Sequence, residues 1–312
     1  MVSQLTPSER KWLSRVRDAD TLSDLARVVD ADSAHEAYLT AKPEWKRLRD
    51  IELDDAQVGD GLPGDCVTLD KRRVCVHGIT HTDTDAERSF LRDHVDEILD
   101  GGGAVYCEQG IRRMYFADMD PVCETDDYEW AMERCRNRDD ATGLAEELEC
   151  GFEEDSGVNL QALTGRLREM AFSLIDGGSE VYGERFTTAL GDVATDFLVT
   201  HEDIGTGRNF TAFRKTRLAA TDPTRLADLQ RYYMQVFLPH PLENEWVRRH
   251  DPELNLFTHA RNERITAYVL AHTDTGPVHI ITGAAHQPGI CYYLTQFRDG
   301  AWSPEFEPLS MD

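Results

Sequence analysis

The pattern of apolar residues changes from helical spacing to β-prone runs after about residue 60, and this change divides the chain. The first 60 residues predict short acidic helices, which begin at a capping box, Thr6-Pro7-Ser8-Glu9, and are interrupted at Lys42-Pro43. After a glycine-rich loop, two β-prone runs at 66–69 and 73–76 flank three polar residues and predict a β-hairpin. We therefore expect an N-terminal helical segment over residues 1–64.

The segment after the hairpin alternates between strand and helix. A second capping box starts at Thr84, and apolar residues at helical spacing continue to Gly101. A short apolar strand at 104–107 then ends at Glu108. This order predicts a βαβ unit, whose crossover makes the two strands parallel and brings their carboxyl ends to one edge of the sheet. His81, just beyond the first strand, is therefore expected at the same edge as Glu108.

The rest of the chain is predicted to be helical before it returns to the sheet. Apolar stripes at 160–175 and 226–237 indicate a helical insertion over about 121–255. Three further elements are predicted, namely a helix at 261–271, a strand at 278–282 and a helix that starts near Pro288. Because 312 residues can form one large core, we predict a single α/β domain over 65–312, with a central, mostly parallel sheet built from βαβ units.

Two of the predicted strands end in the same pattern, a glycine three residues before a histidine. These segments are Gly78-Ile79-Thr80-His81 and Gly283-Ala284-Ala285-His286, whose histidines are 205 residues apart. The glycine is expected to let the backbone turn sharply and to present the imidazole beyond the strand's carboxyl end, where open α/β sheets place their sites. In a third copy, Gly276-Pro277-Val278-His279, the glycine precedes the strand, so His279 is expected inside the strand in a packing role.

The charge of the chain indicates the kind of solution in which it works and the kinds of partner that it can bind. Fifty-eight acidic residues against 33 basic ones give a net charge of −25, and only five of the basic residues are lysine. Such a surface suits a protein in molar salt, where charges are screened over about 3 Å, so we predict a cytoplasmic protein of a salt-accumulating halophile. An ordinary acidic mesophile protein is the alternative. A nucleic-acid partner is excluded, because phosphate binding demands a basic surface.

Membrane insertion and cysteine crosslinks are also not expected. No apolar run approaches the about 18 residues that a membrane span needs, and no signal peptide is recognisable, so no membrane partner is predicted. The seven cysteines form no C-x-x-C pair, and several lie in apolar runs where a free thiol behaves as a small hydrophobe. This pattern predicts neither disulfides nor structural zinc.

The strand-end residues form a set with definable chemistry. His81, His286 and Glu108 could together hold a divalent metal with open positions for water and substrate. Such an ion lowers the pKa of its bound water and polarises a carbonyl, which is hydrolase chemistry. Arg261, on the helix before the last strand, cannot ligate a metal but can hold an oxyanion.

Together these segments resemble the TraB/PrgY/TIKI/GumN superfamily. The resemblance covers about 66–116 and 258–297 and rests on four blocks in their usual order: Gly78-Ile79-Thr80-His81, then Glu108, then Arg261-Asn262 with Ile265, then Gly283-Ala284-Ala285-His286 before Pro288-Gly289-Ile290. It implies a metal-dependent hydrolase, a peptidase as in the TIKI branch, with peptide or small-molecule substrates. TraB and PrgY members are linked to peptide-pheromone shutdown.

The resemblance also implies roles for individual residues. His81, His286 and Glu108 would be the metal ligands, and Glu108, Arg261 and Asn262 would act in catalysis, with manganese, cobalt and zinc as candidates for the ion. The sequence departs from the family pattern where Gln109-Gly110 follows Glu108, and it shows no counterpart of the C-terminal membrane segments of many TraB members.

Two alternatives remain open at this stage. Erythromycin esterases, distant relatives by fold, are thought to activate water with a histidine and a carboxylate, so His81 could act as a general base oriented by Glu108 without a metal. The chain could instead be a regulatory protein that binds a peptide or small ligand and catalyses nothing. Taken singly, a histidine after a strand is more often a hydrogen-bonded turn residue than a ligand.

Overall fold

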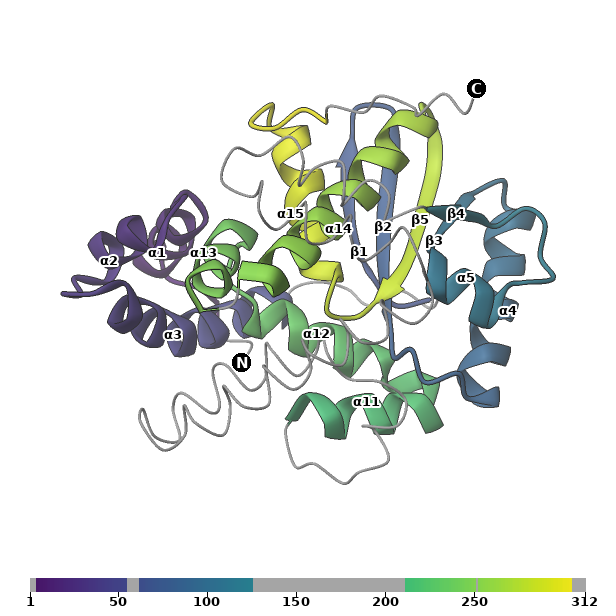
Figure 1. Cartoon of the computed structure of the whole chain (residues 1–312), viewed down its shortest axis with the longest axis horizontal. Helices are drawn as coiled ribbons and strands as arrows, with labels where there is room; N and C mark the ends of the chain where they lie inside the picture. The colour runs from purple at the N-terminus through teal and green to yellow at the C-terminus, as the bar shows by residue number, and fades with distance from the viewer. Residues whose placement is uncertain (1–3, 55–61, 126–210, 251, 305–312) are drawn as a thin grey trace, which may run out of the picture.

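The protein has a mixed α/β fold around a five-stranded sheet (Figure 1). The structure is a computed structural model that describes residues 4–54, 62–125, 211–250 and 252–304. The strands lie in the order β1-β2-β5-β3-β4, and only β1 is antiparallel to its neighbour. Their bounds are β1 Asp65–Leu69, β2 Arg72–Ile79, β3 Ala104–Glu108, β4 Cys123–Thr125 and β5 Gly276–Gly283.

Alternating side chains of the strands build a core on each face of the sheet. On one face, Ile79, Cys107 and Ile281 pack against α4 (Asp85–Asp100), α5 (Gln109–Tyr115), α11 (Thr211–Thr221) and α12 (Leu226–Val236). On the other face, Val76 and Ile280 pack against α14 (Pro252–His272) and α15 (Gln287–Arg298). Covering both faces in this way is what a largely parallel sheet requires.

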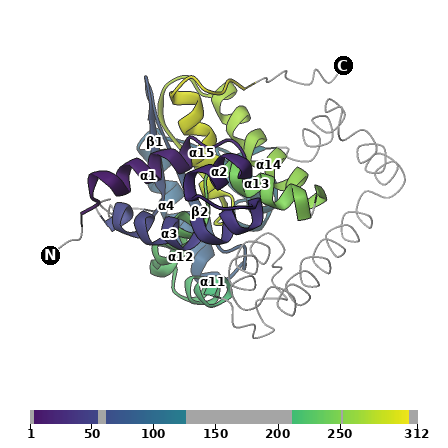
Figure 2. The same cartoon turned by 90° about the vertical axis from the view of Figure 1, so that its left-hand side faces the viewer.

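A third core joins the N-terminal helices to the later part of the chain. The helices α1 (Pro7–Arg17), α2 (Leu22–Val29) and α3 (Ala34–Asp54) pack on Leu242 and Trp246 of α13 (His240–His250). Lys42 and Glu243 form a buried ion pair across this contact, and the hydroxyl of Tyr38 donates to Glu243 at 3.0 Å. Figure 2, in which α1 to α3 face the viewer, shows them against α13. The N-terminal helices therefore share a core with α13.

Most local predictions hold. The hairpin is confirmed as β1 and β2, and the predicted helices and strands reappear as α4, β3, α12, β5 and α15. β2 and β3 both run parallel to β5, which lies between them. The stripe at 160–175 lies outside the described residues. Among the described residues, no helix is both long and apolar enough to cross a membrane.

Three predictions of local structure were wrong. The expected break at Lys42-Pro43 is absent, because α3 continues through Pro43 and packing of its buried face outweighs the lost hydrogen bond. Residues 123–125, predicted to be helical, form the edge strand β4. The predicted insertion boundary near 255 falls inside α14, which runs unbroken from Pro252.

The prediction of no disulfides was also wrong. Cys66 and Cys75 are direct partners in the antiparallel pair β1–β2, with their Cα atoms 4.0 Å apart, and they form a disulfide. The predicted hairpin, with three residues between its strands, would place Cys66 opposite Val76. The observed turn is one residue shorter and pairs Leu69 with Arg72, which brings Cys66 opposite Cys75.

Candidate functional site

Three neighbouring parallel strands carry the candidate residues at their carboxyl ends. Glu108 is the last residue of β3, His81 follows β2 by two residues, and His286 follows β5 by three. Because β5 lies between β2 and β3, the carboxylate and the two imidazoles approach one another over the end of β5. Arg261 and Asn262 reach the same place from α14. The structure thus brings all five sequence-predicted residues together.

The two glycine motifs interlock. A Cβ placed on Gly283 would lie 2.8 Å from Cδ2 of His81 and 3.6 Å from Cδ2 of His286, so both rings border the space that this glycine leaves free. A Cβ on Gly78 would lie 2.7 Å from Cα of Ala284. Each motif therefore makes room for the other, and neither glycine could become alanine without a neighbour moving.

The expected sharp turn at the glycine is present in the second motif only. Gly283 is the last residue of β5, and its carbonyl accepts from the N–H of His286 at 2.9 Å across the turn that follows. Gly78 lies inside β2, and in that motif the positive backbone angle falls on His81, with φ of 59°. A non-glycine residue in this region is strained and needs support from its surroundings. The histidine motifs thus depend on close approach of two strand ends, which local sequence does not reveal.

Glu87 supplies the support for the His81 loop. Its carboxylate is fully buried and accepts hydrogen bonds from the backbone N–H of Thr80 at 2.8 Å and from the hydroxyls of Thr80 and Tyr115 at 2.7 Å. Sequence reasoning assigned Glu87 to a capping box with Thr84. Thr84 does cap α4, but the Glu87 carboxylate turns to Thr80, so this second capping box was wrong.

Glu108 is the best-connected group of the site. One of its oxygens accepts from the Thr282 hydroxyl at 2.8 Å and the Gly283 N–H at 3.2 Å, and the other accepts from Arg261 Nη1 at 3.2 Å. Nε2 of His81 lies 3.8 Å from the first oxygen. Burial alone would raise the pKa of Glu108, but the neighbouring His81 ring and the Arg261 guanidinium hold that pKa below its ordinary value. Glu108 is therefore a buried, ionised carboxylate.

His286 is held in one orientation by Asn262. The two side chains are joined at 2.7 Å between Nδ1 of His286 and Oδ1 of Asn262. The amide oxygen can only accept, so Nδ1 carries the proton and Nε2 of neutral His286 keeps its lone pair. Burial lowers the pKa of His286 to about 3, which favours this neutral form.

His240 is a neighbour that the sequence did not single out. It is buried at the start of α13 and packs on Tyr292 and Tyr293 of α15. A Cβ placed on Gly289 would come within 3.0 Å of its Cδ2 and 2.9 Å of Cγ of Asn262, so the three residues meet beside His286. A lone histidine between two prolines carries no signal that would have placed it here.

The donor set fits a metal only in part. Both imidazoles border one space, and a histidine held through Nδ1 by an oxygen is typical of metal ligands. Both oxygens of Glu108, however, already accept hydrogen bonds, one from Thr282 and the other from Arg261. A metal ion bound to Glu108 would also lie close to the positive charge of Arg261. Among the described residues, no group of three or more His, Cys, Asp or Glu side chains is arranged to hold an ion. As arranged, these residues do not make a three-ligand centre.

Comparison of the chain with protein-family models, with curated proteins and with solved structures gives no match. Any function proposed for the chain therefore rests on its fold and on the residues at the ends of β2, β3 and β5.

Proposed function

We propose that this chain is a hydrolase whose catalytic centre contains His81, Glu108 and His286. The observation that carries the proposal is the buried, ionised Glu108 at the point where two interlocked histidine motifs meet. A carboxylate beside an imidazole favours the imidazolium that forms when the ring takes a proton from water. Two rings and a carboxylate at one strand edge are therefore suited to water activation.

Exposure separates the roles of the two histidines. The side chain of His81 is 32% exposed, so substrate and water can reach it, whereas His286 is buried. We assign His81 as the general base and Glu108 as the group that stabilises its protonated form. His286, neutral and fixed in orientation by Asn262, is the second ring that borders the space where the water would lie.

Arg261 and Asn262 act in this proposal as positioning residues. Arg261 keeps Glu108 ionised through the contact at 3.2 Å, and Asn262 sets the tautomer of His286. Both residues lie in the middle of α14, so a single helix orients both halves of the site. Peptides are the proposed substrate class, and this part of the proposal rests on the motif resemblance.

The metal-dependent form is a second candidate, favoured by the bond between His286 and Asn262. His81 and His286 would hold the ion, and Glu108 would have to leave Arg261 to complete the set. A divalent ion bound there would supply a water of lowered pKa. In the metal-free mechanism Glu108 keeps its bond to Arg261, and in the metal-dependent mechanism it would bind the ion instead. The contacts that Glu108 makes favour the metal-free mechanism.

The finer architecture belongs to the same proposal. We interpret β2, α4 and β3 as one βαβ crossover into which β5 is inserted as the middle strand. A right-handed crossover of this kind is the usual connection between parallel strands and leaves the space between β2 and β3 that β5 occupies.

The experiment is hydrolysis of a panel of fluorogenic peptides and nitrophenyl esters by the full chain. His81→Ala, His286→Ala and Glu108→Gln should each lower the rate by about 100-fold or more, the usual worth of general acid–base catalysis. His272→Gln, on the exposed end of α14, is the matched control and should leave the rate unchanged. A Glu108→Gln variant with the wild-type rate contradicts the proposal.

Two further measurements separate the alternatives. Activity that survives prolonged chelation in a sample free of metal by mass spectrometry supports the metal-free form, and loss of activity that added metal restores supports the metal form. If no substrate is turned over but a peptide binds, and Glu108→Gln changes the binding free energy by only about 1 to 2 kcal/mol, the chain is a binding module.

A further inference from the structure

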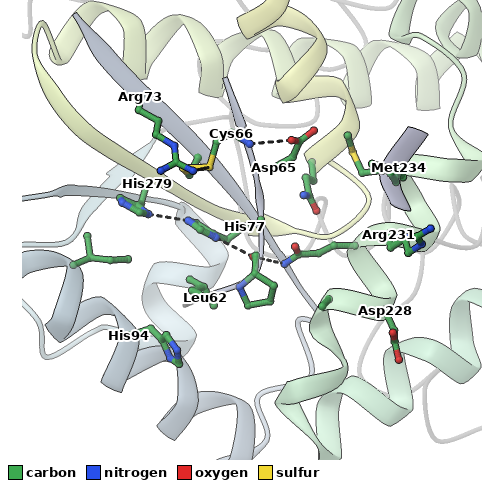
Figure 3. Close-up of a pocket in the computed structure, with 18 of the residues that line it drawn as sticks. Leu62, Asp65, Cys66, Arg73, His77, His94, Asp228, Arg231, Met234 and His279 are labelled. Carbon is green, nitrogen blue, oxygen red and sulfur yellow. Dashed lines mark hydrogen bonds between the residues drawn. A yellow bond between two sulfur atoms is a disulfide. The ribbon is translucent and has the colours of Figure 1, made fainter. Parts of the chain in front are cut away.

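A cavity of about 510 Å³ lies between the sheet, α4 and α12. Its volume is in the range of small-molecule pockets. None of His81, Glu108, Arg261, Asn262 or His286 lines it. Its wall includes both cysteines of the disulfide, together with Arg73, His77, His279 and Gln230 (Figure 3). The disulfide therefore borders a space that a small molecule can occupy.

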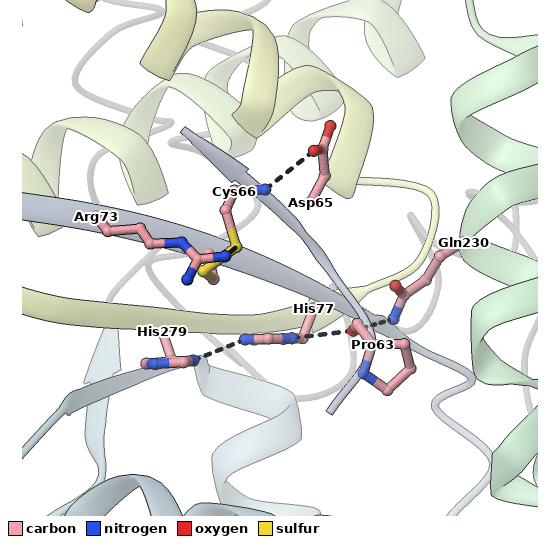
Figure 4. Close-up of a disulfide and its surroundings, with 8 residues drawn as sticks. Pro63, Asp65, Cys66, Arg73, His77, Gln230 and His279 are labelled. Carbon is pink, nitrogen blue, oxygen red and sulfur yellow. Dashed lines mark hydrogen bonds between the residues drawn. A yellow bond between two sulfur atoms is a disulfide. The ribbon is translucent and has the colours of Figure 1, made fainter. Parts of the chain in front are cut away.

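Arg73 distinguishes the two sulfur atoms. Its Nη2 lies 3.3 Å from Sγ of Cys66 and donates to it, and Figure 4 shows the guanidinium beside the disulfide. A positive charge at this distance stabilises a thiolate, so Cys66 is the better leaving group when the disulfide is cleaved. Cys75, the buried partner on β2, is the sulfur left for attack from the cavity.

A histidine pair on the same face of the sheet provides a proton acceptor. His279 is the direct partner of Cys75 in the parallel pair β2–β5. Nδ1 of His77 lies 2.9 Å from the carbonyl oxygen of Pro63, and Nε2 of His77 lies 2.9 Å from Nδ1 of His279. The carbonyl can only accept, so the protons sit on both Nδ1 atoms and Nε2 of His279 keeps a lone pair.

Gln230 fixes this arrangement from α12. Its buried amide donates to the carbonyl oxygens of Pro63 at 2.7 Å and Gly78 at 2.9 Å. The Pro63 carbonyl thus receives two hydrogen bonds and is held against His77. The disulfide, the cation and the histidine pair are therefore parts of one rigid wall of the cavity.

We propose that Cys66–Cys75 is a thiol–disulfide exchange site that reacts with a low-molecular-weight thiol bound in the cavity. The thiol gives its proton to Nε2 of His279, and its thiolate attacks Sγ of Cys75. The Cys66–Cys75 bond breaks, a mixed disulfide forms on Cys75, and Cys66 leaves as a thiolate beside Arg73.

A second thiol completes the reaction. It loses its proton to solvent and attacks the outer sulfur of the mixed disulfide, and Cys75 leaves and takes the proton from His279. Two small thiols are thereby oxidised to one small disulfide with release of one proton, while the protein disulfide is reduced to one thiol and one thiolate. No further oxidant or reductant is needed.

The experiment measures the rate at which glutathione reduces this disulfide in the folded full chain. Trypsin cuts after Lys71 and Arg72, so the intact disulfide links two peptides and mass spectrometry of alkylated digests follows its loss without interference from other cysteines. Arg73→Gln should slow reduction by about threefold to tenfold, because it removes the cation that stabilises the leaving thiolate. Lys71→Gln removes the same charge from the hairpin turn and should change nothing.

A second variant tests the cavity itself. Ala227 lines the cavity from α12, so Ala227→Trp should fill it and slow reduction at least tenfold in the folded state. In urea all variants should react at the wild-type rate. The proposal is overturned if Arg73→Gln is reduced as fast as wild type in the folded state. It is equally overturned if the wild type is reduced only at the rate of global unfolding. It is also overturned if Cys66 and Cys75 remain free thiols in protein that has been treated with an oxidant.

Discussion

Alanine at Gly283 and alanine at Gly78 should damage the protein in different ways. At Gly283 the new methyl group would lie 2.8 Å from Cδ2 of His81, a ring that is partly exposed and can swing outward. The free energy of unfolding should therefore fall by only about 1 kcal/mol, the low end of overpacking costs. The imidazole, however, must move, and a displacement of about 1 Å at a catalytic group costs about 100-fold in rate.

At Gly78 the methyl group meets backbone that cannot swing away. Cα of Ala284 lies 2.7 Å from the built Cβ, and the N–H of Ala284 is bonded to the carbonyl of Ile79 at 2.9 Å. The clash must be relieved by separating β2 from the turn after β5. We expect the free energy of unfolding to fall by about 3 kcal/mol.

Both variants are assayed in the same way: urea unfolding measures stability, and the NMR resonances of the His81 ring report its position. The hydrolysis rate is a third measurement. Gly283→Ala should shift the His81 resonances while its unfolding midpoint stays near that of wild type, and Gly78→Ala should lower the midpoint strongly. Unchanged His81 resonances in Gly283→Ala, or a greater loss of stability there than in Gly78→Ala, would refute the interlocked arrangement.

Three further outcomes follow from the charges. Glu243→Gln leaves the Lys42 cation buried without its partner, so urea unfolding should show a loss of about 3 to 5 kcal/mol, and a loss below about 1 kcal/mol would contradict docking of the N-terminal helices on α13. Burial lowers the pKa of His77 to about 4, so the unfolded chain binds a proton below pH 6.5 that the folded protein refuses. Stability should therefore decline as pH falls from 6.5 toward 4, and the share of His77 in this decline is about 2 kcal/mol at pH 5. His77→Gln should make the decline shallower by that share, while the buried His240 and His286 keep theirs. With a net charge of −25, the thermal midpoint should drop steeply as KCl is lowered from molar to about 0.01 M, and a flat midpoint would remove the halophile hypothesis.

Local pattern was enough to predict the elements around the site. β-prone apolar runs predicted β1, β2 and β5, and helical spacing with a cap at Thr84 predicted α4. These signals work because backbone periodicity and capping involve residues at most a few positions apart. The candidate residues could also be placed at strand ends, since the carboxyl edge of a parallel sheet follows from chain order.

Only the tertiary structure decided how those strand ends meet. The insertion of β5 between β2 and β3, the contact of Glu108 with Thr282, and the bond of Asn262 to His286 join residues far apart in the chain. Periodicity carries no information about such pairs, because many strand orders satisfy the same local pattern. For the same reason the glycines were assigned to turns, although their missing side chains serve packing between the two motifs.

The disulfide and the hydrogen bonds of Glu87 show where rules based on sequence spacing give the wrong answer. Cys66 and Cys75 are joined because hairpin register places them opposite each other, not because of their spacing in sequence. Glu87 occupies a capping-box position, yet its carboxylate turns to Thr80, because burial at that point demands a partner for every polar group. The sequence by itself determined the elements and their order. Which strand lies beside which, and which buried donor meets which acceptor, was decided by packing in three dimensions.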